Sequence, residues 1–493
     1  MNRRDFLAAA ATASLTALVP RLPAQTARPR PNVLFIAVDD LRPELNCYGR
    51  THIVSPNLDA LAATGLMFTH AYCQQAVCSP SRTSLLTGLR PDSTRVYDLE
   101  THFRKNVPEV TTLPEHFKNQ GYFVTGIGKL FHGGLNDEQS WSEPYLRIDG
   151  GKGYVEEDNL AFVRQRQEAI RQAPAAGRSR MRAYSFPFEA GDVPDNAYND
   201  GRMTEIAETT LERLTGQDQP FFFAVGYLKP HLPFNCPKRF WDLYDPASIS
   251  MADNPFAPEG APPIALHTSG ELRAYREVPP GSAPIPDDLA RKLIHGYYAC
   301  VSYTDHNIGR LLKKLAELGR DRDTLVVVWG DHGWHLGDHG LWCKHTNFET
   351  ATRVPMFLRV PGAASAGTPC HALTEFVDIY PTLCELAGLP LPPHLEGTSF
   401  APLVENPQRP WKRAAFSQYP RGGDVMGYSM RTERHRYTEW IRRSGTTEAI
   451  ELYDHETDPQ ENTNLAVRPE HAELVARLGT LLHEGWRAAR PPA

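Results

Sequence analysis

The 493-residue sequence lacks the features that mark several classes of protein. Its eight cysteines are too few for a disulfide scaffold, and none has the C-x-x-C spacing of a common zinc site. The formal net charge of −6 at pH 7 argues against a general nucleic-acid-binding protein, although it is compatible with a local basic pocket. With 41% hydrophobic and 22% charged residues, the composition is that of an ordinary globular protein. The length of 493 residues predicts one large and one smaller domain.

The sequence also lacks an apolar run long enough to cross a bilayer, so we expect no stable membrane insertion. The apolar stretch at residues 7–19 follows Arg3-Arg4-Asp5-Phe6-Leu7, which is a twin-arginine pattern, and precedes small residues near Ala24 and Ala27. We interpret residues 1–27 as a twin-arginine signal peptide. This interpretation implies the twin-arginine export machinery as a partner and a bacterial protein that is periplasmic or secreted.

Four short apolar runs have the length and composition of buried strands: 33–38, 122–127, 221–227 and 325–329. Helical patterns alternate with these runs, at 56–64, 113–120, 205–214, 289–318 and 376–387. Strands that alternate with helices predict the α/β class, with a mainly parallel sheet sandwiched by helices. The polar stretch 133–199 and the proline-rich stretch 254–286 are expected to be loops.

The pattern changes near residue 400. Shorter strand-like pieces follow at 427–431 and 436–441, and an amphipathic helix is expected at 472–486. We therefore expect a main catalytic domain over residues 28–400 and a smaller C-terminal α+β subdomain over residues 401–493.

Each of the four apolar runs is followed within a few residues by ionisable side chains. These are, in chain order, Asp39 and Asp40, Lys129 and His132, Lys229 and His231, and Asp331 and His332. Because ligands of parallel sheets bind beyond the carboxyl ends of the strands, the pattern predicts one site along one edge. The carboxylates and the imidazole of His332 suit Ca²⁺, with Mg²⁺ as the alternative. An acidic turn without a metal is the simpler interpretation of any one pair.

Residues 78–88 read as a short helix. Ser79 is expected as its N-cap, Pro80 as its first helical residue, and Gly88 as its end. Cys78 then lies at the positive end of the helix, and Arg82 adds a cation on the same side. A small buried cysteine is the plainer interpretation. However, a soft thiolate suits a hard cation poorly, which favours a chemically modified Cys78.

The motif Cys78-x-Pro80-Ser81-Arg82, followed by Leu86-Thr87-Gly88, resembles the maturation signature of the type I sulfatases. The resemblance implies an alkaline-phosphatase-like fold and oxidation of Cys78 to formylglycine, whose hydrated aldehyde is the nucleophile. It also implies a formylglycine-generating maturation enzyme as a partner. Within that family, these segments resemble the iduronate-2-sulfatase group: 38–43, 78–98, 128–132, 229–234, 331–337 together with Lys344, 416–421, 426–432 and 451–454. That group carries His at the position of His332, where many other sulfatases carry Asn.

The resemblance further implies a set of roles, which agree with the charge that develops during sulfuryl transfer. Metal ligands are Asp39, Asp40, Cys78, Asp331 and His332. Arg82, Lys129 and Lys344 neutralise sulfate oxygens, His132 orients and deprotonates the aldehyde hydrate, and His231 protonates the leaving alcohol. Lys229, Trp334 and His345 are our candidates for contacts with the sugar or its carboxylate.

The leading hypothesis is a sulfatase that removes the 2-O-sulfate of a uronic acid from a sulfated carbohydrate. Residues 343–345 and the loops of 133–199 depart from the animal enzymes of the group, so a different sulfated sugar is the first alternative. A phosphonate or phosphodiester hydrolase of the same superfamily is the second alternative. The third is a glycan-binding protein in which Cys78 is never matured.

Overall fold

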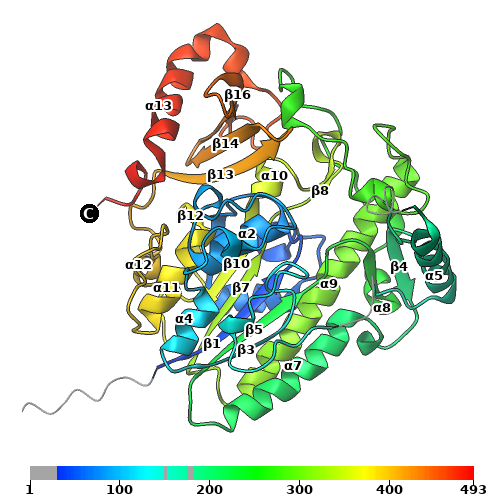
Figure 1. Ribbon diagram of the computed structural model, residues 1–493, viewed down its shortest axis with the longest axis vertical. Helices are drawn as coiled ribbons and strands as arrows, with labels where there is room; N and C mark the ends of the chain where they lie inside the picture. The colour runs from blue at the N-terminus through cyan, green and yellow to red at the C-terminus, as the bar shows by residue number, and fades with distance from the viewer. Residues whose placement is uncertain (1–29, 149–152, 175–180, 493) are drawn as a thin grey trace, which may run out of the picture. The chain divides into compact units, whose positions relative to one another are not determined.

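The computed structural model describes residues 30–148, 153–174 and 181–492 (Figure 1). The twin-arginine interpretation of residues 1–27 therefore lies outside the described residues. None of the helices within the described ranges combines the length and the apolar character that a membrane span requires.

A mixed eight-stranded sheet forms the centre of the fold, in the order β11-β2-β10-β7-β1-β5-β3, with β12 also pairing with β2. Its strands are β1 (Asn32–Val38), β2 (Leu66–Tyr72), β3 (Phe123–Gly128), β5 (Phe221–Tyr227), β7 (Thr324–Gly330), β10 (Arg353–Arg359), β11 (Pro369–Cys370) and β12 (Thr374–Glu375). β1 is parallel to both β5 and β7, and β3 is parallel to β5. The four predicted strands are thus neighbours that run in one direction.

The sheet is buried on both faces, because helices pack against each of them. Successive side chains of a strand point to opposite sides, so each strand contributes to two cores. In β1, Leu34 and Ile36 enter one hydrophobic core, whereas Val33 and Phe35 enter the other. The first core is completed by α1 (Pro56–Thr64), α7 (Asn199–Thr215) and α9 (Asp287–Glu317), and Figure 1 shows α7 and α9 running together. The second is completed by α2 (Cys78–Thr87), α4 (Leu113–Asn119), α11 (Ile379–Leu386) and α12 (Ala401–Glu405).

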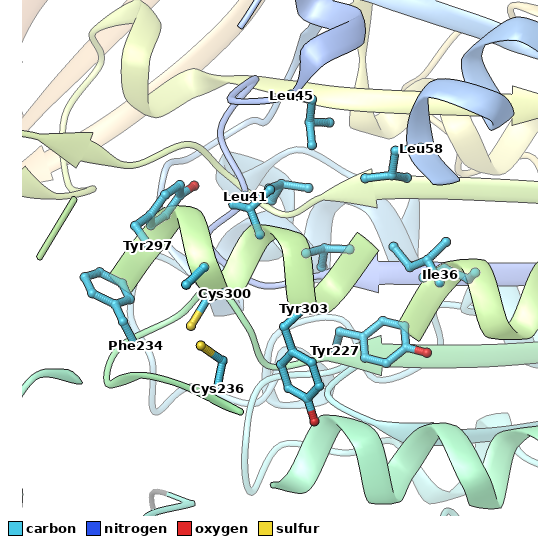
Figure 2. Close-up of a cluster of buried hydrophobic side chains, with 14 of the residues drawn as sticks. Ile36, Leu41, Leu45, Leu58, Tyr227, Phe234, Cys236, Tyr297, Cys300 and Tyr303 are labelled. Atoms are coloured by element: carbon cyan, nitrogen blue, oxygen red, sulfur yellow. The ribbon is translucent and has the colours of Figure 1, made fainter. Parts of the chain in front are cut away.

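The first core also contains two buried cysteines. Figure 2 shows Cys236 of β6 (Phe234–Pro237) and Cys300 of α9 with their sulfur atoms turned toward one another. All eight cysteines of the chain are free thiols in this structure.

The helix that carries Cys78 begins earlier than expected. It starts at Cys78, after Val77 in an extended conformation, and no side chain caps it. The predicted N-cap Ser79 is therefore inside the first turn, as is Pro80, where its missing N–H costs little. The end is as predicted: Gly88 adopts the left-handed conformation, with φ of 69°, and donates its N–H to the carbonyl of Ser84.

Several other expectations need correction. The stretch 133–199 is not only loop, because it contains α5 (Glu157–Gln172) and β4 (Phe188–Gly191), which pairs with β6. Of the residues in α5 only Asn159 is buried, so its sequence carries no strong apolar stripe. Helix α7 begins six residues before the expected position. The expected mainly parallel sheet is confirmed, with β10 running antiparallel to β7 and β2.

The C-terminal part is an antiparallel sheet covered by a helix. Its strands β13 (Ala414–Arg421), β14 (Val425–Thr432), β15 (His435–Arg442) and β16 (Thr447–Asp454) pair in sequence order. Helix α13 (Ala472–Ala488) packs on it through Leu478 and Leu482, and Figure 1 shows it in red beside the orange strands. The short elements that complete the chain are α3 (Pro91–Thr94), α8 (Lys238–Trp241), α10 (Glu349–Thr352), β8 (His335–Leu336) and β9 (Trp342–Cys343).

Candidate functional site

The ionisable residues predicted after the four strands meet at one edge of the sheet. Asp39 and Asp40 follow β1, Lys129 follows β3, Lys229 follows β5, and Asp331 follows β7. Since these strands are adjacent and parallel, their carboxyl ends converge, as the sequence predicted.

Three carboxylates form the centre of the site, and the backbone fixes them against one another. The N–H of Asp40 donates to Oδ1 of Asp331 at 2.9 Å, and the hydroxyl of Tyr297 donates to the Asp40 carbonyl at 2.8 Å. Asp40 has a φ of 61°, which is unusual for a residue other than glycine. Asp39 is 1% exposed, and Asp40 and Asp331 are fully buried. This strained turn therefore places buried negative charge at the end of β1.

Three cations surround the carboxylates. The fully buried Arg82 donates from Nε to Asp331 at 2.8 Å and from Nη2 to Asp39 at 3.1 Å. Lys129 Nζ donates to Asp39 at 2.6 Å, and Lys344 Nζ lies 3.1 Å from Asp40. Burial alone would raise the pKa of Asp39, but Lys129, His231 and Arg82 bring it well below its ordinary value. Burial dominates at Asp40 and raises its pKa to about 7.

Cys78 lies in this polar environment at the start of α2. Its Sγ is 3.5 Å from Lys129 Nζ and 3.4 Å from His332 Nε2. Burial, followed by the Asp39 carboxylate, raises the pKa of the Cys78 thiol well above its ordinary value. The unmodified side chain is thus a neutral, soft group among hard, charged ones.

The donor set fits a hard divalent cation. One donor atom from each of Asp39, Cys78, Asp331 and His332 can be chosen so that all lie within 4.8 Å of one another, and Asp40 Oδ1 is 3.4 Å from His332 Nε2. Oxygen-rich sites of this kind favour Ca²⁺ or Mg²⁺ over softer metals. An oxygen at position 78 would complete the set better than sulfur does.

Two histidines, His132 and His231, line the same cavity beside the carboxylates. His132 borders a cavity of about 420 Å³ that also reaches Asp39, Lys129, Lys229 and His231. Burial, and then the Lys129 ammonium, lowers the pKa of His132 to about 3, so its imidazole is neutral at pH 7. His231 donates from Nδ1 to the Leu232 carbonyl at 2.6 Å, which turns its Nε2 toward the carboxylates.

The three candidates for sugar contacts have different surroundings. Lys229 borders the cavity, and its Nζ donates to the carbonyls of His231, at 2.8 Å, and Pro233. Trp334 is 1% exposed and packs under Lys344, whose Nζ lies 4.9 Å from the ring centroid. His345 is partly buried beside Tyr419, and burial lowers its pKa well below the ordinary value. Only Lys229 among the three borders the large cavity.

Sequence reasoning missed two carboxylates that the structure places at the site. Glu271 bridges His231 and Lys344, with contacts of 3.0 and 2.8 Å. Asp200, in α7, accepts N–H bonds from Leu228 and Lys229 and so shapes the turn that precedes His231. Burial raises the pKa of Asp200 to about 6. Neither residue follows a strand, and the only available signal was an acidic residue near the start of a polar helix or within a proline-rich stretch.

Comparisons with known proteins agree with this geometry. The family model described as Sulfatase matches residues 31–389, and the model described as N-sulphoglucosamine sulphohydrolase, C-terminal, matches residues 337–487. Iduronate 2-sulfatase of Mus musculus is 35% identical over 526 residues, which cover 91% of this chain and 93% of that protein.

Two solved structures are also similar. A phosphonate monoester hydrolase of Agrobacterium radiobacter has a TM-score of 0.73 at 25% identity, covering 93% of this chain and 96% of its own. A protein in complex with its substrate D-glucosamine-2-N,6-O-disulfate has a TM-score of 0.71 at 24% identity, covering 92% and 97%. The expected alkaline-phosphatase-like fold is therefore confirmed. The chain belongs to the sulfatase family, close to the iduronate 2-sulfatases, and is a sulfuric ester hydrolase.

Proposed function

We propose that this sulfatase removes the 2-O-sulfate from a uronic acid of a sulfated glycan. The observation that carries the proposal is the 35% identity to mouse iduronate 2-sulfatase along nearly the whole of both chains. The site supports the sulfatase reaction, because a ring of cations faces a residue that the family converts into an oxygen nucleophile.

The residues of the site fit both a divalent cation and a formylglycine at position 78. Asp39, Asp40, Asp331 and His332, together with residue 78, would bind the divalent cation, which supplies charge to lower the pKa of a bound oxygen. A formylglycine made from Cys78 would supply a hydrated aldehyde, with one hydroxyl to attack sulfur and a second to release sulfate. Both assignments need oxygen where the unmodified chain has sulfur.

The lysines are the groups that can neutralise the sulfate. Lys129 Nζ already lies 3.5 Å from Cys78 Sγ, and Lys344 approaches from the side of Asp40. Arg82 has its N–H groups engaged by Asp39, Asp331 and the carbonyls of Lys129 and Leu130. We propose that Arg82 contributes its charge from behind the carboxylates, whereas Lys129 and Lys344 reach the sulfate oxygens.

The two histidines are suited to moving protons in opposite directions. The buried Nδ1 of His132 has no hydrogen-bond partner within the described part of the chain. Because its pKa of about 3 makes the imidazole a weak base, we propose that His132 orients the nucleophile and takes its proton only as the bond to sulfur forms. Both ring nitrogens of His231 face oxygen atoms, at the Leu232 carbonyl and at Glu271. His231 is therefore placed to hold a proton on Nε2 and to give it to the leaving alcohol.

Substrate recognition follows from the same surroundings. We propose that Lys229, on the wall of the cavity, contacts the uronate carboxylate when its bonds to the carbonyls of His231 and Pro233 rearrange. Trp334 would act on the sugar through Lys344, whose Nζ lies over its ring, whereas His345, beside Tyr419, is proposed to contact the sugar or its carboxylate.

A panel of sulfated disaccharides tests the substrate. Purified enzyme with Ca²⁺ is expected to release sulfate from a 2-O-sulfated uronate at the non-reducing end. The matched control is the same disaccharide with its sulfate moved to the 6-position of the amino sugar. Release from galactose or fucose sulfates, without release from the uronate sulfate, would contradict the substrate and leave the reaction class in place.

A phosphonate or phosphodiester hydrolase is the second candidate, because the Agrobacterium enzyme shares the fold. Rates on 4-nitrophenyl sulfate and on aryl phosphonate monoesters and phosphodiesters separate the two. We expect the sulfate to be the better substrate. A chain that keeps the Cys78 thiol would instead bind sulfated glycans without releasing sulfate.

We also propose that the maturation enzyme modifies the unfolded chain in the cytoplasm and that the twin-arginine machinery then exports the folded product. A double variant, Arg3→Lys with Arg4→Lys, should keep active enzyme in the cytoplasm. Normal periplasmic activity of that variant would contradict the route.

A further inference from the structure

The proline-rich stretch 254–286 delivers one carboxylate to the site. Glu271 precedes a single turn of 3-10 helix, Leu272–Ala274, and lies far in sequence from every other residue of the site. Its Oε1 is 3.0 Å from His231 Nε2, and its Oε2 is 2.8 Å from Lys344 Nζ. One side chain therefore bridges two groups to which the reaction assigns separate tasks.

The backbone around Glu271 is held firmly although it lacks regular structure. Leu272, which begins the turn, and Tyr275, which follows it, are 1% and 3% exposed. The Ser269 hydroxyl accepts the N–H of Trp342 at 3.0 Å, which ties the stretch to β9. Arg273 donates to the carbonyls of Thr268 and Ala283, each at 2.8 Å. These contacts restrict the position from which the Glu271 carboxylate reaches into the site.

Both partners of Glu271 also face Asp40. Lys344 Nζ is 3.1 Å from Asp40 Oδ1, and His231 Nε2 is 3.8 Å from Asp40 Oδ2. Without Glu271, Asp40 would be the nearest carboxylate to both the His231 imidazole and the Lys344 ammonium. Because Asp40 belongs to the proposed metal-binding set, a shift of His231 toward it would move the imidazole away from the substrate.

We propose that Glu271 is a positioning residue that holds the His231 imidazole beside the departing sugar oxygen, with Lys344, which Asp40 also holds, as the second anchor of the Glu271 carboxylate. This inference rests on the proposed role of His231 as proton donor. In that step the sulfuryl group would pass to the oxygen nucleophile of residue 78, and the S–O bond to the sugar breaks with its electron pair staying on the sugar oxygen. The Nε2 proton of His231, which faces Glu271 before the reaction, passes to that sugar oxygen. Lys344 keeps its proton and its charge. The negative charge of Glu271 stays outside the metal site.

Burial raises the pKa of Glu271, but Lys344 and His231 together outweigh it and lower the pKa well below its ordinary value. Glu271 is thus a carboxylate at neutral pH, as a bridge between two proton donors requires.

Two substrates with different leaving groups distinguish a positioning role of Glu271 from a general disturbance of the site. A sugar alcohol leaves poorly without a proton, whereas 4-nitrophenolate leaves readily as an anion. The variant Glu271→Gln is expected to lose roughly 100-fold in kcat on the sulfated sugar that the enzyme accepts, at the low end of what a general acid contributes. On 4-nitrophenyl sulfate it should lose about threefold or less, because proton donation contributes little there. Glu271→Asp keeps a carboxylate but is one methylene shorter, so its kcat on the sulfated sugar should lie between those of Glu271→Gln and the unaltered enzyme.

Glu277→Gln is the matched control, since Glu277 lies in the same stretch and its side chain is 65% exposed. It should match the unaltered enzyme on both substrates. Equal losses of Glu271→Gln on the two substrates, or no loss on the sugar, would overturn the inference. The ratio can be read on any sulfated sugar that is hydrolysed. If the uronate assignment is wrong, the unaltered enzyme will not release sulfate from the uronate substrate. If the role of Glu271 is wrong, the unaltered enzyme is unaffected, and only the ratio of the two losses of Glu271→Gln will differ from the prediction.

Discussion

Replacement of Arg82 by lysine tests how the carboxylates of the site are held. Arg82 spans Asp331 and Asp39 with two charge-assisted hydrogen bonds, of 2.8 and 3.1 Å, from a side chain with no exposed surface. Lysine keeps the charge but lacks the planar fork, so it can serve only one carboxylate well. Loss of one hydrogen bond to a charged group costs about 1.5–3 kcal/mol.

Because the two carboxylates are proposed metal ligands, the loss of this hydrogen bond should weaken metal binding and turnover as well as the stability of the fold. We expect Arg82→Lys to weaken metal affinity or kcat/KM by about 10- to 150-fold, which is that free energy expressed as a ratio at about 1.4 kcal/mol per factor of ten. The assays are metal competition with a chromophoric chelator and turnover of 4-nitrophenyl sulfate.

Arg90 provides the matched control. It is also buried, and it donates two hydrogen bonds, of 2.7 and 2.9 Å, to Glu375, outside the site. Arg90→Lys should lower the temperature of unfolding to a similar extent but leave metal affinity and turnover unchanged. If Arg82→Lys behaves like Arg90→Lys in both assays, the reasoning about the site is wrong.

Three further predictions concern the metal, the backbone and pH. Treatment with a chelator should abolish sulfate release, and added Ca²⁺ or Mg²⁺ should restore it; activity that survives complete metal removal would contradict the site. Gly226→Ala should lower activity or the yield of folded protein, because its Cβ would lie 2.2 Å from the carbonyl carbon and oxygen of Lys129, and wild-type turnover would contradict this packing. Burial raises the pKa of Glu451 from 4.5 to about 7, so its contribution to stability is largest below pH 4.5 and falls as pH rises through 7, by up to about 3 kcal/mol. Glu451→Gln should therefore flatten the fall in unfolding temperature between pH 5 and pH 8, and an unchanged fall would show that another group is responsible.

The sequence predicted the edge of the site well, for a physical reason. Each of β1, β3, β5 and β7 is a short apolar run, and a buried parallel strand leaves that signal whatever surrounds it. Because parallel strands end at a common edge, Asp39 and Asp331 were placed together without any knowledge of the strand order. Gly88 was likewise predicted to end its helix, since few residues other than glycine readily adopt the left-handed conformation found there.

The remaining features depend on contacts that leave no periodic pattern. Glu271 reaches the site from a stretch without regular structure, and its position depends on packing of Leu272 and Tyr275. Helix α5 is mostly exposed, so its apolar residues are few. Strand β10 contains Pro355 and an irregular register between Val354 and Met356, which weaken the signal of a central strand. The positive φ of Asp40 has no local signature in the sequence.

The most direct measurement is the mass of one peptide. Trypsin releases residues 51–82 of the active enzyme as a single peptide that ends at Arg82 and contains Cys78. We predict an aldehyde at position 78, seen as replacement of the thiol by a carbonyl oxygen and as reaction with a hydrazide, while Cys73 in the same peptide keeps its thiol. A fully active enzyme whose peptide carries two intact thiols would contradict the account.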